Sequence, residues 1–109
     1  MNSIKTALLQ IMPGGSAEDN LRLGIEACER AAQMGADIAL FPEMWSCGYN
    51  IPEDITELKA LAVPREGEFT EAFRKAAQRL GIAVAVTYLE SFDPLPRNTV
   101  TLFDRTGRR

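Results

Sequence analysis

The segment Gly35-Ala36-Asp37-Ile38-Ala39-Leu40-Phe41-Pro42-Glu43 joins a helix stop, a strand and a carboxylate in one short run. Gly35 is a natural end for a preceding helix, because glycine adopts the left-handed conformation of helix C-termini at little cost. The continuous apolar run 38–41 is typical of a strand buried on both faces, and Pro42 ends it. Glu43 is therefore expected just past the carboxyl end of a strand, the edge at which open α/β sheets usually build their sites.

Upstream of this segment the pattern predicts a strand, a turn and a helix. Residues 4–12 are apolar and compact, as in a buried strand, and Pro13-Gly14-Gly15 ends them. Ser16 is the predicted N-cap of a helix that runs to about Met34. The predicted apolar stripe of this helix consists of Leu21, Ile25, Cys28 and Ala32. A strand, a helix and a strand in this order imply a right-handed crossover and a parallel pair.

Downstream, helices and strands continue to alternate, which places the chain in the α/β class. A short helix is predicted from near Pro52 to Leu61, and a stronger one over residues 69–80, ended by Gly81. Strands are predicted over residues 82–90 and 98–103, and a turn follows over 104–107. Because an edge strand after such a turn would leave backbone groups unpaired, we expect residues 1–109 to be one partial domain of a longer protein.

Composition excludes several function classes. The net charge of −3 gives no electrostatic reason to expect nucleic acid or an anionic membrane as a partner. No stretch is long and apolar enough to cross a bilayer, and the first residues lack the features of a signal peptide, so the cytoplasm is the expected location. The chain contains no histidine, which excludes a Ser-His-Asp or Cys-His arrangement within it. Neither a metal nor another cofactor is expected.

Glu43 is the first candidate for chemistry. Because Phe41, Pro42, Met44 and Trp45 flank it, we expect its carboxylate to be partly shielded from water, which suits a general base. An exposed loop glutamate is the competing interpretation. Cys47 follows four residues later and invites assignment as a nucleophile, but no positive charge nearby would stabilise its thiolate. Cys28 lies on the predicted apolar stripe and is expected in the core.

The stretch LFPEMWSCGY, residues 40–49, resembles the glutamate motif of the nitrilase superfamily of carbon–nitrogen hydrolases. In that motif a strand ends in a Pro-Glu pair, and a Gly-Tyr pair follows shortly. The resemblance covers nearly the whole chain. It includes the opening strand and helix, the Gly-Ala-Asp-Ile sequence before Pro42-Glu43, the segment Gly81-Ile82-Ala83-Val84, the Asn98-Thr99 pair and the turn Asp104-Arg105-Thr106-Gly107.

The resemblance implies the N-terminal part of a four-layer α-β-β-α sandwich. It also implies a Glu-Lys-Cys triad, in which the cysteine attacks an amide, N-carbamoyl or nitrile carbon without a cofactor or metal. Glu43 takes the general-base position, and Trp45 and Tyr49 are candidates for the substrate pocket, with simple packing as their alternative. Lys59 and Lys75 do not match the lysine position, so the chain alone is expected to be inactive. A homo-oligomer is the expected assembly.

Two further interpretations of the sequence stay open. The first is a non-catalytic remnant that acts in binding or assembly. The second is a flavodoxin-like binding module that uses Gly14 and Gly15 to hold a phosphate, since helix N-termini attract anions. The segment 13–16 matches neither known phosphate-binding fingerprint, and a turn followed by an N-cap also explains it.

Overall fold

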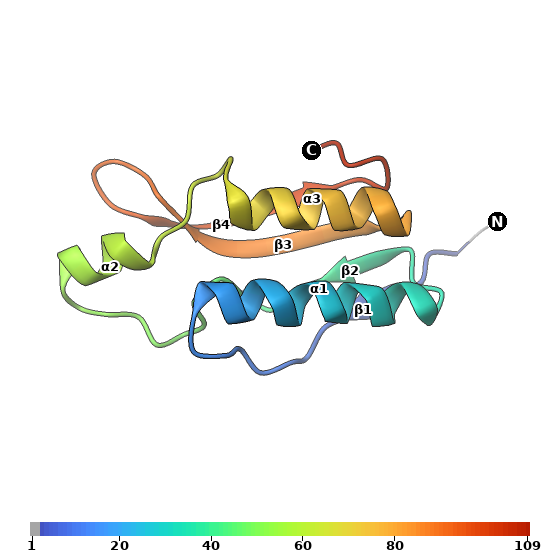
Figure 1. Cartoon of the computed structure of the whole chain (residues 1–109), viewed down its shortest axis with the longest axis horizontal. Coiled ribbons are helices and arrows are strands. Elements are labelled where there is room, and N and C mark those ends of the chain that lie inside the picture. The colour runs from blue at the N-terminus through green and yellow to red at the C-terminus, as the bar shows by residue number, and fades with distance from the viewer. Residues whose placement is uncertain (1–2) are drawn as a thin grey trace.

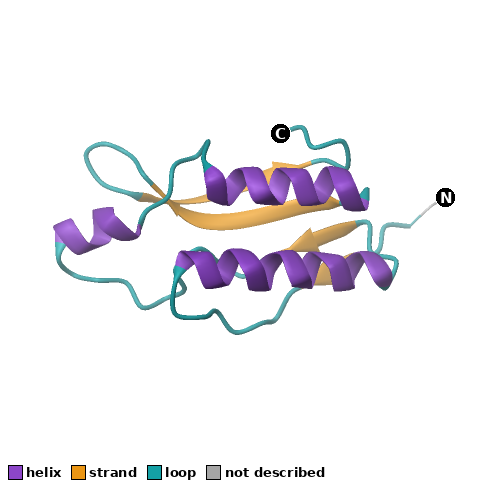
Figure 2. Ribbon diagram, in the orientation of Figure 1, coloured by secondary structure: helices purple, strands orange, loops and turns teal. Residues whose placement is uncertain are grey.

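The computed structural model describes residues 3–109 as a four-stranded sheet with two long helices along it (Figure 1). The strands are β1 (Thr6–Leu8), β2 (Ile38–Leu40), β3 (Ala83–Glu90) and β4 (Arg97–Phe103). The helices are α1 (Ala17–Gln33), α2 (Ile55–Leu61) and α3 (Glu68–Leu80). Figure 2 shows α1 and α3 side by side against the sheet, so the predicted α/β class is confirmed. Within residues 3–109 no helix has the length and apolarity that a membrane span requires.

The sheet has the strand order β1-β2-β3-β4. β1 pairs with β2 and β2 with β3 in parallel, which confirms the predicted strand–helix–strand crossover, and β3 pairs with β4 antiparallel. The carboxyl ends of β1, β2 and β3 therefore meet at one edge of the sheet. The N-termini of α1 and α3 lie at this same edge, on the left in Figure 1.

The helix ends follow local capping chemistry. Ser16 is the N-cap of α1, as predicted, and its hydroxyl accepts a hydrogen bond of 3.1 Å from the backbone N–H of Asp19. Gly81 ends α3 in the left-handed conformation with a φ of 68°. The start of α2 is later than predicted, because the Asp54 side chain and not Pro52 caps it, accepting from the N–H of Glu57 at 2.9 Å.

The buried stripe of α1 is rotated from the predicted one. Its fully buried residues are Asn20, Gly24, Cys28 and Ala31, while the predicted Leu21, Ile25 and Ala32 are only partly buried. Gly24 explains the rotation, since a Cβ there would lie 2.7 Å from both Trp45 Nε1 and Phe73 Cζ. The two large rings therefore settle against the glycine, and that contact sets which side of α1 faces inward.

The core lies between the sheet and the two long helices. Phe41 and Phe73 meet edge to face at its centre, with ring centroids 5.2 Å apart, and Trp45 packs beside Phe41 at 5.6 Å. Cys28 is fully buried here, as predicted, and burial raises the pKa of its thiol to about 12. This thiol is therefore unreactive and packs in the core as a small apolar group.

The other face of the sheet is open, and two predictions fail there. Residues 4–12 are mostly exposed instead of buried, with Leu8 at 67% exposure. β2 is buried on one face only, because Ala39 points toward the helices while Ile38 and Leu40 point away and are half-buried. Strand alternation explains both results, since every second side chain lies on the face that α1 and α3 do not cover.

Candidate active site

Glu43 lies in the loop directly after β2, at the edge where the parallel strands end. Its side chain is exposed, so the predicted shielding from water is wrong. The neighbours Phe41, Met44 and Trp45 are buried, as their apolar character requires. The chain turns at this point so that these neighbours point into the core and the carboxylate points out.

Tyr49 is the nearest described partner of the Glu43 carboxylate. Its hydroxyl donates a hydrogen bond of 3.1 Å to Glu43 Oε1, although the tyrosine itself is 67% exposed. Partial desolvation and the adjacent Glu43 carboxylate raise the pKa of the Tyr49 hydroxyl. Two predicted site residues thus meet at the surface, and the pair presents a carboxylate with one oriented hydrogen-bond donor.

Trp45 lies elsewhere, in the core, with 1% of its surface exposed. Its indole N–H donates to the backbone oxygen of Asn20 at 2.8 Å. The structure therefore gives Trp45 a packing role, and its role in a substrate pocket stays a prediction.

Buried polar side chains hold the loop that carries Glu43. The Asn20 side chain accepts from the N–H of Gly14 at 2.5 Å and donates to the backbone oxygen of Ser46 at 3.2 Å. The Ser46 hydroxyl accepts from the N–H of Leu89 on β3 at 3.0 Å. Sequence reasoning missed Asn20 and Ser46, because a polar residue on an amphipathic helix or in a loop is normally solvated. The only signal in the sequence concerns Asn20, which lies one turn from Gly24 on the same side of α1.

Cys47 is poorly suited to act as a nucleophile. It is half-buried, and its thiol is 3.4 Å from the backbone oxygen of Gly48. Burial raises the pKa of this thiol, which disfavours the reactive thiolate. Within residues 3–109 no ion pair joins Glu43 to a lysine or arginine, and Lys59 and Lys75 are exposed on α2 and α3.

An open apolar groove of about 490 Å³ runs past the ends of β1 and β2. It is lined by residues 8–12 and 40–42, so it reaches the residue before Glu43. Among the described residues no group of three histidine, cysteine, aspartate or glutamate side chains is placed to hold a metal ion.

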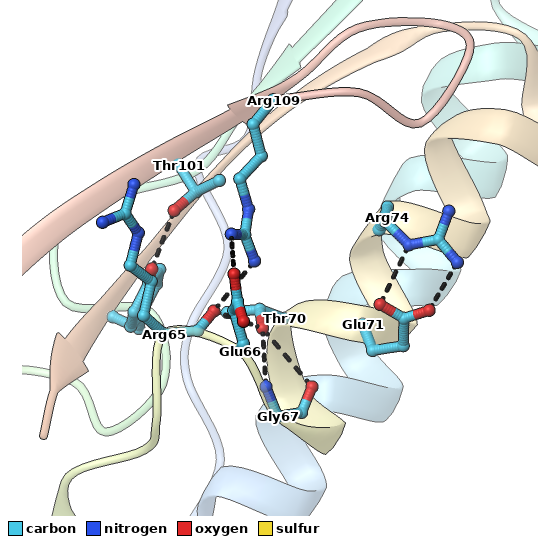
Figure 3. A network of polar contacts seen from close by, with 9 residues as sticks. Arg65, Glu66, Gly67, Thr70, Glu71, Arg74, Thr101 and Arg109 are labelled. Atoms are coloured by element: carbon cyan, nitrogen blue, oxygen red, sulfur yellow. Dashed lines mark hydrogen bonds and ion pairs between the residues drawn. The ribbon is translucent and has the colours of Figure 1, made fainter.

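A second polar network lies at the start of α3 (Figure 3). Arg109 donates to Glu66 Oε1 at 2.9 Å and to the backbone oxygen of Arg65 at 3.2 Å, and the Thr70 hydroxyl donates to the same oxygen at 2.8 Å. Glu71 and Arg74 pair one turn further along. These contacts connect the segment after β4 to the first turn of α3, so we interpret this network as structural.

Glu90, at the end of β3, is 4% exposed and is a structural carboxylate. It accepts hydrogen bonds from the Thr99 hydroxyl at 2.7 Å and from Arg97 Nε at 3.2 Å. The Thr99 hydrogen bond and the Arg97 charge lower the pKa of the Glu90 carboxyl despite its burial. These contacts give Glu90 a structural role at the end of β3, while Asn98 is exposed on β4.

Comparison with known proteins points to one family. The family described as carbon-nitrogen hydrolase matches residues 5–109. The glutamine-dependent NAD(+) synthetase of Thermotoga maritima is 32% identical over 93 residues, which cover 84% of this chain and 16% of that protein. The NitN amidase of Nesterenkonia sp. AN1 has a similar structure, with a TM-score of 0.77 and 25% identity over 97% of this chain and 41% of that one. A variant of that amidase in complex with butyramide has a TM-score of 0.71 and 25% identity over 96% of this chain and 40% of that one. The chain thus spans less than half the length of these relatives.

Proposed function

Because the chain belongs to the carbon–nitrogen hydrolase family, we propose that it forms the N-terminal part of an enzyme cleaving amides, N-carbamoyl compounds or nitriles, with Glu43 as general base. The observation that carries the proposal is the position of Glu43. Its carboxylate emerges directly after β2 at the edge where the parallel strands end, from a loop held by buried hydrogen bonds. That is the place at which α/β sheets present catalytic side chains.

The proposed chemistry is covalent catalysis by a Glu-Lys-Cys triad. Glu43 accepts the proton of a cysteine thiol as its sulfur attacks the amide carbon, and then gives this proton to the amide nitrogen, so that the C–N bond breaks, ammonia leaves and a thioester forms. Glu43, now a carboxylate again, takes a proton from water as the water attacks the thioester, and gives it to the leaving sulfur, so that the C–S bond breaks and the acid and the thiol are released. The lysine stabilises the negative oxygen that forms in each step.

The lysine and the nucleophilic cysteine belong to residues outside this chain in the proposal. Cys47 has a raised pKa, and no lysine pairs with Glu43 within residues 3–109. The 109-residue chain alone is therefore proposed to be inactive. Small amides are the favoured substrate class, since the similar Nesterenkonia amidase has been solved with butyramide. A cytoplasmic location and assembly as a homo-oligomer are part of the same proposal.

The test uses the native protein with its complete chain. Ammonia release is measured from butyramide, an N-carbamoyl compound and a nitrile, for the wild type, Glu43→Gln and the control Glu53→Gln. Glu53 is an exposed glutamate of the same irregular segment. We expect Glu43→Gln to lower kcat by roughly 100-fold or more while the fold is kept, because the general base is lost. Substantial turnover by Glu43→Gln would remove Glu43 from the mechanism.

A non-catalytic domain is the second candidate, favoured by the lack of a lysine and a reactive cysteine beside Glu43 among the described residues. The intact mass of the native protein separates the two functions. A mass far above 12.0 kDa supports the enzyme, and a mass near 12.0 kDa supports the non-catalytic domain.

A further inference from the structure

We propose that Thr87 is a positioning residue for Glu43, with a hydroxyl group that ties together the backbone on both sides of the glutamate. This proposal rests on the proposed role of Glu43 as general base. Thr87 lies on β3, and its hydroxyl donates a hydrogen bond to the backbone oxygen of Pro42. The Thr87 hydroxyl oxygen in turn accepts a hydrogen bond of 3.0 Å from the N–H of Trp45.

The two backbone groups that Thr87 contacts enclose Glu43 and Met44. The Pro42 carbonyl belongs to the peptide bond that leads into Glu43, and the Trp45 N–H belongs to the one that leaves Met44. One hydroxyl from a sheet strand therefore spans the turn that aims the carboxylate. Thr87 is more than 40 residues away in sequence, so this contact exists only in the folded protein.

The turn needs such a restraint because its backbone is unusual. Met44 has a φ of 61°, in the left-handed region that residues with a side chain rarely adopt. Conformations of this kind persist only where the surrounding structure fixes them, and they concentrate at functional sites. Ser46 and Asn20 restrain the chain beyond the turn, whereas Thr87 restrains it on both sides.

The direction of the Glu43 side chain depends on this backbone. The carboxylate is exposed. Among residues 3–109 it accepts a hydrogen bond from Tyr49, which is itself mostly exposed. This surface contact places the glutamate less firmly than the backbone that Thr87 holds on both sides. Because a general base must lie within hydrogen-bond reach of its proton donor, a shift of the turn lowers the rate of the chemical step.

The kinetic test compares Thr87→Val, Thr87→Ser and Thr101→Val in the complete native protein with butyramide as substrate. Valine keeps the shape of threonine but removes both hydrogen bonds, and serine restores them. Thr101→Val is the matched control, since it removes a buried threonine hydroxyl that is 2.7 Å from the Tyr88 hydroxyl, away from the Glu43 turn.

We expect Thr87→Val to lower kcat by roughly 10- to 100-fold with KM changed less than about twofold, because the base is misplaced while binding is kept. Thr87→Ser should return kcat to near the wild-type value, and Thr101→Val should leave kcat unchanged. Equal losses of kcat in Thr87→Val and Thr101→Val would overturn the proposal, since they would reflect general destabilisation.

A double variant tests whether Thr87 acts through Glu43. In the Glu43→Gln background, Thr87→Val should cause no further loss of the residual rate, because there is no base left to position. A further loss as large as that in the wild-type background would overturn the proposal.

Amide hydrogen exchange separates this proposal from the proposed function. If the wild-type protein releases no ammonia from any of the substrates, the proposed function fails, and exchange then decides the role of Thr87. The N–H of Trp45 should be protected in the wild type and exchange roughly tenfold faster in Thr87→Val, because its partly buried hydrogen bond to the Thr87 hydroxyl is lost. An unprotected Trp45 N–H in the wild-type protein alone would overturn the proposal. Equal exchange rates of this N–H in the wild type and in Thr87→Val would also overturn it.

Discussion

The two faces of the sheet differ sharply although the same strands build both. On the helix-covered face Val84, Val86, Tyr88 and Phe103 are fully buried. On the open face Leu8, Val100 and Leu102 are 52–67% exposed. The apolar character of the strands is therefore the same on both sides, and burial depends on what packs against each side. An apolar outer face of this kind is what a sheet-on-sheet architecture needs.

This difference agrees with the fold class. The sheet and its single helix layer correspond to the N-terminal part of the nitrilase-type α-β-β-α sandwich, as the structural similarity to the Nesterenkonia amidase shows. Three predictions below test the comparison of the two faces, and they run from the largest expected effect to the smallest.

Truncation of a large side chain that packs against the helix-covered face and of one on the open face should give very different losses of stability. Phe73 is fully buried against the helix-covered face, so Phe73→Ala should lower the free energy of unfolding by about 3–5 kcal/mol. Leu102→Ala on the open face should lower it by less than about 1 kcal/mol, because half of that side chain is already in water. Urea unfolding of both variants measures the difference. Similar losses would mean that the open face is covered in solution.

The open face should also drive self-association of the purified 109-residue chain. Replacement of Leu102 by lysine places a charge on that face, and association should weaken by roughly tenfold or more, because about half a leucine side chain can no longer be buried favourably. Analytical ultracentrifugation over a concentration series measures the association constant. Lys75→Glu on the exposed side of α3 is the control and should leave it unchanged. A monodisperse monomer at all concentrations would contradict the prediction.

Glu90, the buried carboxylate at the end of β3 on the helix-covered face, should make the stability of the protein depend on pH. The pKa of Glu90 is lower in the folded protein than in the unfolded protein. Its ionised form therefore contributes fully to stability at pH values above the pKa of the unfolded state. That contribution is lost as the pH falls through the lowered folded value. The urea midpoint of the wild type should therefore fall more steeply than that of Glu90→Gln below about pH 4.5. Parallel midpoint curves for the two proteins between pH 6 and pH 3 would show that the Thr99 and Arg97 contacts contribute little.

Local signals in the sequence were enough for most of the element pattern. Ser16 and Gly81 end their helices because capping depends on one residue and its immediate neighbours. The apolar run before Pro42 predicts β2, and the order of elements predicts the parallel pairing of β1 with β2. The place of Glu43 after β2 follows from the same local reasoning. The family was indicated by a resemblance of several motifs along nearly the whole chain, and the family match over residues 5–109 agrees with it.

Exposure and contact required the folded molecule. The stripe of α1 turns because Trp45 and Phe73, distant in sequence, press against Gly24. Glu43 is exposed because the turn at Met44 aims its neighbours inward, and that turn is tied by Thr87 from β3. Capping and strand signals depend on a few neighbouring residues, so they can be recognised directly in the sequence. Burial and hydrogen bonding between distant segments arise when the chain closes on itself, and the partner of each group then depends on all the others.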